Sequence, residues 1–180
     1  RDPVPLDEAV LAIAEEEYPD LDVEEVLVRL DRLGQRVRAR APVRDRAASI
    51  LSALREVLVE EEGLRGNERE YHDPRNSFLN EVLERKVGIP ITLSVVYLHV
   101  AQAVGLRAVG VGLPGHYIVK VQFDLSEVYV DPFHEGRSLT VADIDRMLSE
   151  MSNGRVRLRS EHLRGWTPRE TLMRVLANLQ

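Results

Sequence analysis

The segment from Pro90 to Val104 (PITLSVVYLHVAQAV) constrains the fold more than any other part of the chain. Proline suits the first turn of a helix, and the apolar residues that follow lie on nearly every helical face rather than in one stripe. A helix with this pattern must be covered on most sides. The chain has 180 residues, enough for one sizeable hydrophobic core, so we expect this segment to be the central helix of that core.

After Gly105 the apolar pattern changes from helical to alternating, which is typical of strands. Four segments alternate in this way: Arg107–Gly112, His116–Phe123, Glu127–Asp131 and Arg155–Arg159. Short turns join the first three, so we expect an antiparallel sheet. If the second hairpin turns at Asp124 and Leu125, the numbers of opposite residues sum to about 249, which brings His116 and Asp131 together on one face.

Helical patterns with a single apolar stripe flank this central region. They predict packing helices over residues Asp7–Glu17, Asp22–Arg40, Asp45–Glu61, Thr140–Met151 and Thr167–Leu179. The order of helices, then sheet, then helices predicts an α+β fold: a central buried helix packed on an antiparallel sheet of about four strands. We divide the chain into a helical region (residues 1–62), a core (63–160) and a terminal helix (161–180).

The composition excludes several classes of function. The chain contains no cysteine, which rules out a disulfide framework, an iron–sulfur cluster and a zinc site built on thiolates. No segment reaches the roughly 18 apolar residues needed to cross a bilayer, and we expect a soluble cytoplasmic protein. Gly110, Gly112 and Gly115 do not form a dinucleotide-binding fingerprint, so we expect no cofactor. The net charge is −6. We interpret the basic stretch 151–180 as a solvated face or as an intramolecular complement to the acidic helices, and we expect neither nucleic acid nor membrane as a partner.

Two residues in the core suggest chemistry. His116 opens one predicted strand and Asp131 closes the next, beside the start of the buried helix. A histidine held by an aspartate near a helix amino end is two thirds of a nucleophilic triad. The nearest hydroxyls are Thr92 and Ser94, and hydrogen bonding back to a helix carbonyl is their ordinary role.

Two other interpretations of the pair stay open. His116 can be a strand-end histidine bonded to Asp131 for structural reasons alone. Together with His134, the pair also offers two imidazoles and one carboxylate, a donor set that binds transition metals, although the spacing is not a recognised ligand motif.

Several stretches taken together resemble a known family. They are Gly66-Asn67, Tyr71–Ser77, Val82–Arg85, Gly88–Ser94, Gly110–His116 and Asp131–Phe133. They are similar to the transglutaminase-like superfamily, in particular its SirB-type bacterial branch, and imply a papain-like α+β fold. By this resemblance His116 and Asp131 fall on the superfamily's His and Asp. The nucleophile falls on or beside Ile91, where no residue can supply a thiolate.

The resemblance and the missing thiol together suggest a function. We expect a non-catalytic domain that binds a protein or peptide partner through the residual cleft, lined by Tyr71, Asn76 and Ile91. Asn76 is also interpreted as a loop-structuring residue. The alternative is a hydrolase or acyl transferase using Ser94 or Thr92 with His116 and Asp131. The resemblance further implies that the terminal helix begins a helical-repeat region beyond residue 180.

Overall fold

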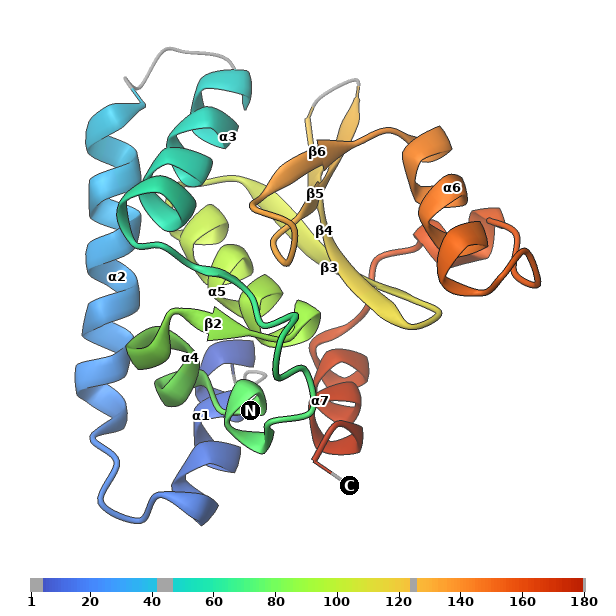
Figure 1. The fold of residues 1–180 in the computed structure, drawn as a ribbon. Helices are drawn as coiled ribbons and strands as arrows, with labels where there is room; N and C mark the ends of the chain where they lie inside the picture. The colour runs from blue at the N-terminus through green and yellow to red at the C-terminus, as the bar shows by residue number, and fades with distance from the viewer. Residues whose placement is uncertain (1–4, 42–46, 124–125, 180) are drawn as a thin grey trace.

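The computed structural model of the protein describes residues 5–41, 47–123 and 126–179 (Figure 1). Its α-helices are α1 (Leu6–Glu17), α2 (Val23–Arg40), α3 (Ala47–Arg55), α4 (Leu79–Arg85), α5 (Pro90–Ala103), α6 (Val141–Met151) and α7 (Pro168–Ala177). A π-helical segment, Glu56–Glu61, continues α3, and short 3-10 helices cover Pro74–Ser77 and Ser160–Leu163. The predicted start of the third helix at Asp45 lies outside the described residues.

The main sheet has four antiparallel strands in the order β3-β4-β5-β6. They are β3 (Arg107–Leu113), β4 (His116–Gln122), β5 (Glu127–Asp131) and β6 (Arg137–Leu139). Val119 pairs with Val130 and Gln122 with Glu127, so the predicted register of β4 against β5 is confirmed. The predicted turn at Asp124 and Leu125 lies outside the described residues. A separate parallel pair joins β1 (Arg65–Gly66) to β2 (Val87–Gly88).

The helix α5 is the centre of the molecule, as predicted. Eleven of its 14 residues are buried, more than in any other described helix, because neighbours cover it on most sides. It packs on β3 and β4, while α1, α2, α4 and α7 pack around its remaining faces. Figure 1 shows α5 between the helices α1 to α4 and the sheet. The α+β prediction is therefore confirmed.

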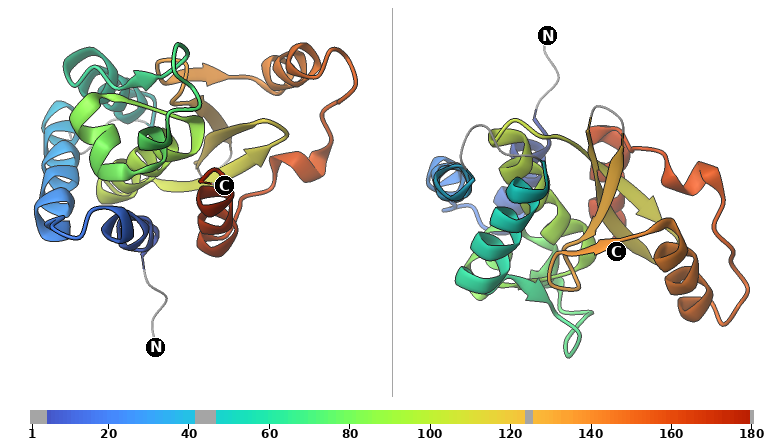
Figure 2. Two further views of the ribbon diagram at one scale, coloured as in Figure 1. Left: turned by 60° about the horizontal axis from the view of Figure 1, so that its bottom comes forward. Right: turned by 90° about the horizontal axis from the view of Figure 1, so that it is seen from above.

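The opposite face of the sheet has a smaller core of its own. Val111, Ile118 and Tyr129 from the sheet pack there with Ile144 and Leu148 of α6. Thr140 begins α6 with a capping box, in which its side chain and that of Asp143 each accept a backbone N–H of the other residue. Figure 2 shows α6 and the α2–α3 pair on opposite sides of the sheet. The sheet is thus the middle layer of three.

One predicted strand is wrong. Residues Arg155–Arg159 form no strand, and the fourth strand is the three-residue β6. The alternation of arginine and apolar residues fits a strand, but side chains in and directly after α6 accept the backbone N–H groups that a strand would use for pairing. Ser152 Oγ accepts the N–H of Val156 at 2.9 Å, and Asp145 Oδ1 accepts the N–H of Leu158 at 2.9 Å. These bonds hold the segment along α6 instead of beside the sheet.

No helix in the described ranges is both long enough and apolar enough to cross a membrane.

Candidate functional site

The strands β4 and β5 bring His116 and Asp131 together at one end of the sheet. His116 follows the turn at Gly115, whose φ of 75° is the left-handed conformation that glycine adopts without strain. The His116 Nε2 atom lies 3.0 Å from Asp131 Oδ2. His116 is 4% exposed and Asp131 is fully buried. The predicted pairing of these two residues is therefore present, and it is shielded from water.

A tight turn after β5 aims the Asp131 carboxylate. Its Oδ1 accepts the backbone N–H groups of Phe133 at 3.2 Å and His134 at 3.3 Å, so Oδ2 faces the imidazoles. The turn continues through Gly136, where φ is 62° and an added β-carbon would lie 2.0 Å from the Tyr97 hydroxyl. Only glycine fits this position without displacing Tyr97.

His134 is a second imidazole on the same carboxylate. Its Nδ1 lies 2.7 Å from Asp131 Oδ2, and its ring centroid is 5.5 Å from that of His116. We call His116, Asp131 and His134 the groove cluster. Burial alone would raise the pKa of the Asp131 carboxyl, but the hydrogen bonds from both imidazoles outweigh burial and hold that pKa well below its usual range. The carboxylate is therefore ionised at neutral pH.

The third member of a triad is missing from the groove cluster. Thr92 Oγ1 donates to the Asn76 carbonyl at 2.7 Å and also approaches the Ile89 carbonyl, so its expected bond to a preceding carbonyl is confirmed. The same expectation is wrong for Ser94, whose buried Oγ has no hydrogen-bond partner among the described residues. Neither hydroxyl bonds to His116. Ile91, the second residue of α5, is 2% exposed.

The groove cluster also has the donor set of a metal site. The three candidate ligand atoms all lie within 4.8 Å of one another. However, a metal-bound histidine ordinarily donates its other ring N–H to a nearby acceptor. Within the described ranges, neither His116 nor His134 makes such a second hydrogen bond, and the bonds to Asp131 account for the convergence. We therefore interpret the cluster as a hydrogen-bonded one.

The sequence is similar to known proteins along most of its length. The profile of the Transglutaminase-like superfamily matches residues 24–177. The chain belongs to this superfamily. A UPF0162 protein of Xylella fastidiosa is 34% identical over 179 residues, covering 98% of this chain and 64% of the relative. A UPF0162 protein of Pseudomonas aeruginosa is 29% identical over 184 residues, covering 100% of this chain and 65% of the relative.

A third relative is more distant. F-box only protein 21 of Mus musculus is 29% identical over 111 residues, which cover 57% of this chain and 18% of that protein. No solved structure matches the sequence significantly. The transglutaminase-like chain thus spans less than two thirds of the length of its UPF0162 relatives. The family resemblance inferred from the residues is confirmed.

Aromatic rings cover the groove cluster of this transglutaminase-like domain. Phe133 lies edge-on to His116 with centroids 6.0 Å apart, and edge-on to Tyr71 at the same distance. Tyr71 is 40% exposed, so it forms the outer part of this cover. Its hydroxyl is partly withdrawn from water, and burial raises the pKa of Tyr71.

Asn76 holds the loop that precedes α4. Its amide nitrogen donates to the carbonyls of Glu70 at 2.7 Å and Tyr71 at 3.2 Å, and its Oδ1 accepts from Asn67 at 3.0 Å. The residue is fully buried, as a loop-structuring role requires. Its participation in a binding cleft, like that of Tyr71 and Ile91, stays a prediction.

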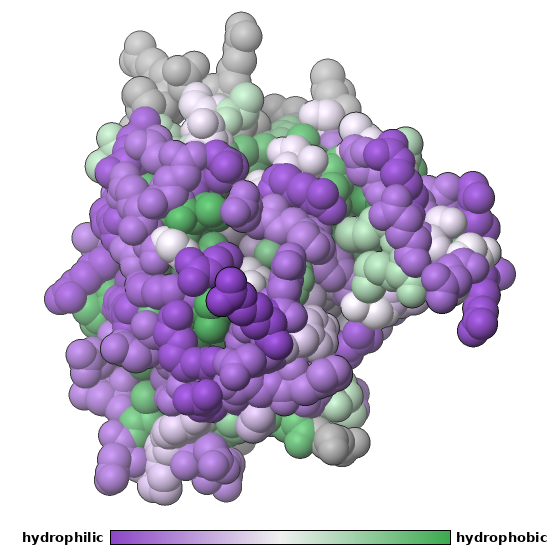
Figure 3. Space-filling model, viewed as in Figure 1, coloured by the Kyte–Doolittle hydropathy of each residue, from purple (hydrophilic) through white to green (hydrophobic). Residues whose placement is uncertain are grey.

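A groove of about 710 Å³ lies beside the groove cluster, with His134 in its wall. One side is the loop from Arg65 to Arg69, and the other is the turn from Phe133 to Arg137. Figure 3 shows that the face containing this loop is mostly hydrophilic. This groove could not be predicted from the sequence, because its two sides lie more than sixty residues apart and meet only in the fold.

A second cluster of histidine and aspartate lies among the helices. His99 of α5 places Nδ1 2.7 Å from Asp7 Oδ2 of α1 and Nε2 3.1 Å from Asp31 Oδ1 of α2. We call these three residues the helix cluster. The hydrogen bond to Asp7 raises the pKa of His99, against the opposing effect of burial. His99 belongs to the segment Pro90–Val104, which the sequence predicted as the buried helix.

Proposed function

We propose that this domain binds a protein or peptide partner through the groove beside His134 and does not catalyse acyl transfer. The observation that carries the proposal is the absence of an activated nucleophile. The chain has no cysteine, the Thr92 hydroxyl is committed to the Asn76 carbonyl, and Ser94 makes no bond to His116. An acyl-enzyme mechanism needs a nucleophile within hydrogen-bond reach of its base.

The surroundings of His116 support the same conclusion. A catalytic base must reach the proton that it removes, and His116 is only 4% exposed beneath Phe133 and His134. The pair with Asp131 instead ties the end of β5 to the start of β4. These two strands hold the turn that forms one side of the groove. The groove cluster therefore maintains the shape of a binding surface. The lack of cysteine is compatible with a reducing compartment, and we propose that the domain is cytoplasmic.

Position-dependent cross-linking tests the proposal. The photoreactive residue p-benzoylphenylalanine replaces Glu68 or Glu135, which are exposed in the groove walls. Matched controls carry it at Glu84 or Glu161, exposed sites outside the groove. Each purified full-length variant is irradiated with a library of short random peptides. We expect adducts from the groove positions and few from the controls. Equal labelling at all four positions, or none at any, would contradict a peptide-binding groove.

One observation favours the alternative, a hydrolase or acyl transferase. Among the described residues the buried Ser94 hydroxyl has no hydrogen-bond partner, and a catalytic role is one physical explanation of such an unsatisfied buried group. This alternative requires turnover of an ester or amide that disappears in both Ser94→Ala and His116→Ala. Loss in only one of the two variants would not fit a serine–histidine mechanism.

A further inference from the structure

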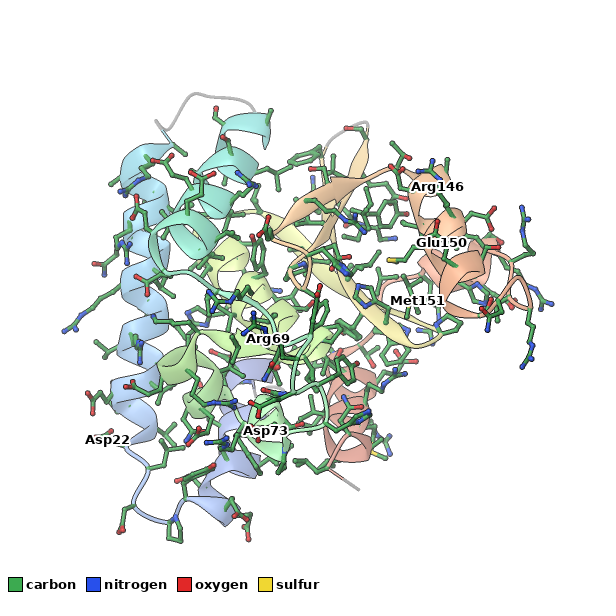
Figure 4. The ribbon with its side chains drawn as sticks, in the orientation of Figure 1. Asp22, Arg69, Asp73, Arg146, Glu150 and Met151 are labelled. Atoms are coloured by element: carbon green, nitrogen blue, oxygen red, sulfur yellow. The ribbon has the colours of Figure 1, made fainter. Side chains whose placement is uncertain are left out.

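The groove beside His134 is rich in arginine. Arg55, Arg65, Arg69 and Arg137 line it, against two acids, Glu68 and Glu135. All six are exposed. Arg69 is labelled near the centre of Figure 4, on the loop that forms one side of the groove. The protein as a whole has a net charge of −6, whereas arginines outnumber acids in the wall of this groove.

Two of these arginines have no partner among the described residues. The side chains of Arg65 and Arg69 make no ion pair or hydrogen bond within the part of the chain that the structure describes. Elsewhere, arginines commonly bind carboxylates, as do Arg36, Arg75, Arg85, Arg157 and Arg164. Other exposed arginines, such as Arg32 and Arg155, also make no ion pair within the described residues. What sets Arg65 and Arg69 apart is that both lie in the wall of one groove.

The other two arginines differ from each other. Arg55 is paired with Glu60 and is not free to bind. Arg137 makes one long contact, 3.9 Å to Asp131 Oδ2, and that oxygen already accepts from both imidazoles of the groove cluster. Arg137 is half exposed and lies across the groove from Arg65 and Arg69. Three guanidinium groups can therefore face a ligand from two sides.

We infer that the occupant of the groove is an acidic peptide segment, whose carboxylates bind Arg65, Arg69 and Arg137. This inference rests on the proposed binding function and names the chemistry of its partner. A guanidinium group binds a carboxylate through two parallel hydrogen bonds, which makes arginine well suited to bind acidic side chains. Acidic side chains of the partner would thus supply carboxylates for arginines that have no carboxylate partner among the described residues.

A peptide fits the groove better than a nucleic acid does. Glu68 and Glu135 interrupt the arginines, and they would repel a phosphate backbone that carries a charge at every nucleotide. A peptide can place its carboxylates opposite the arginines and uncharged residues opposite the two acids. Proteins that bind nucleic acid without sequence preference also present a continuous basic track with stacking aromatic rings, and this wall is not continuous.

Fluorescence anisotropy with three peptides of equal length tests the inference. One alternates glutamate with serine, the second replaces glutamate by glutamine, and the third replaces it by lysine. An oligothymidylate is the nucleic-acid probe. Each is titrated with the purified full-length protein, with Arg65→Gln/Arg69→Gln, and with the control Arg32→Gln/Arg155→Gln. The control removes the same charge from two exposed arginines that do not line the groove.

We expect the glutamate peptide to bind most tightly and to lose about tenfold in affinity in the groove variant. The control should change affinity less than twofold, apart from a general salt-dependent effect. Equal binding of all three peptides, unaffected by the groove variant, would overturn the acidic partner and leave a peptide groove. If none of the three peptides binds, the proposed peptide-binding function is contradicted as well. Preferential binding of the oligothymidylate would assign the groove to nucleic acid and overturn both.

Discussion

The groove cluster and the helix cluster use the same two residue types in opposite proportions. In the helix cluster, one imidazole lies between two carboxylates, and both of its nitrogens are bonded. In the groove cluster, one carboxylate lies between two imidazoles and also accepts two backbone N–H groups. Each of those imidazoles uses one nitrogen only, among the residues that the structure describes.

This difference separates a structural cluster from one that can still bind. His99 has no free nitrogen, so it can only connect α1, α2 and α5. Within the described ranges, one ring nitrogen of His116 and one of His134 make no hydrogen bond, and His134 lines the groove. The residue types alone do not distinguish the two clusters. What distinguishes them is how many hydrogen-bonding positions are already filled and where the rest point.

Removing the central carboxylate should cost the most stability. Asp131 is fully buried and accepts four hydrogen bonds, so Asp131→Ala should lower the free energy of unfolding by about 3 kcal/mol at pH 7. The matched change in the helix cluster, Asp31→Ala, removes a carboxylate that is 61% exposed and should cost less than about 1 kcal/mol. Urea unfolding of both variants measures the difference. Equal losses of unfolding free energy in the two variants would contradict the distinction between the groove cluster and the helix cluster.

The cost of Asp131→Ala should also depend on pH. The folded-state pKa of Asp131 is depressed, so its contribution is present above the unfolded value near 3.9. That contribution is lost as pH falls through the folded value. The stability gap between wild type and variant should therefore be constant from neutral pH down to about pH 5 and narrow in stronger acid. A gap that widens in acid would contradict the assignment of the shift to Asp131.

The two hydroxyls beside the groove cluster should differ. Thr92→Val removes a buried hydrogen bond to the Asn76 carbonyl and should cost about 1.5 kcal/mol. Ser94→Ala removes a hydroxyl that has no partner in the described part of the chain, so the free energy of unfolding should stay the same or rise slightly. Thermal unfolding of both variants provides the measurement. A large loss from Ser94→Ala would show that this hydroxyl is engaged, which would sharpen the case for catalysis.

The helix cluster should give a pH-dependent contribution of its own. The folded-state pKa of His99 is raised, so its pairing stabilises the protein below the unfolded pKa near 6.5 and is lost as pH rises through the folded value. His99→Gln should cost about 1 kcal/mol at pH 6 and much less at pH 9. Unfolding at the two pH values tests this. A loss that is the same at both would mean that packing, not charge, is the role of His99.

His134 should contribute least to stability, although it belongs to the groove cluster. Its side chain is 36% exposed, so His134→Ala should lower the free energy of unfolding by about 0.5 kcal/mol. Loss of this donor should also raise the pKa of Asp131 toward its usual value. A carbon-detected NMR titration of the carboxylate follows this change. An unaltered Asp131 pKa would show that the imidazole of His116 holds the carboxylate by itself.

The sequence was sufficient for the parts of the fold that depend on short-range patterns. The all-round apolar pattern of Pro90–Val104 predicted the central helix. The position of the second hairpin turn set which residues of β4 and β5 are opposite, and hence the approach of His116 to Asp131. The first prediction depends on periodicity along one segment and the second on a short turn between two neighbouring segments, and the sequence displays both directly.

The remaining features depend on contacts between distant segments. The strand β6 has three residues, too few to show a period. The alternation in Arg155–Arg159 failed because Asp145, on another element, binds the backbone of Leu158. His134 reaches Asp131 through the turn in which the N–H groups of Phe133 and His134 bond to Asp131 Oδ1, and residue types alone do not reveal this turn. The arginine wall likewise appears only when the Arg65–Arg69 loop meets the Phe133–Arg137 turn.

An NMR titration of the protein labelled in its histidine rings, with the glutamate–serine peptide as ligand, tests the central claim most directly. The account predicts that the His134 ring signals shift with peptide concentration, that the His99 signals stay in place, and that the peptide remains intact throughout. Stationary His134 signals would contradict binding in the groove. Peptide products that form with wild type but not with Ser94→Ala would contradict the claim that the groove cluster no longer catalyses.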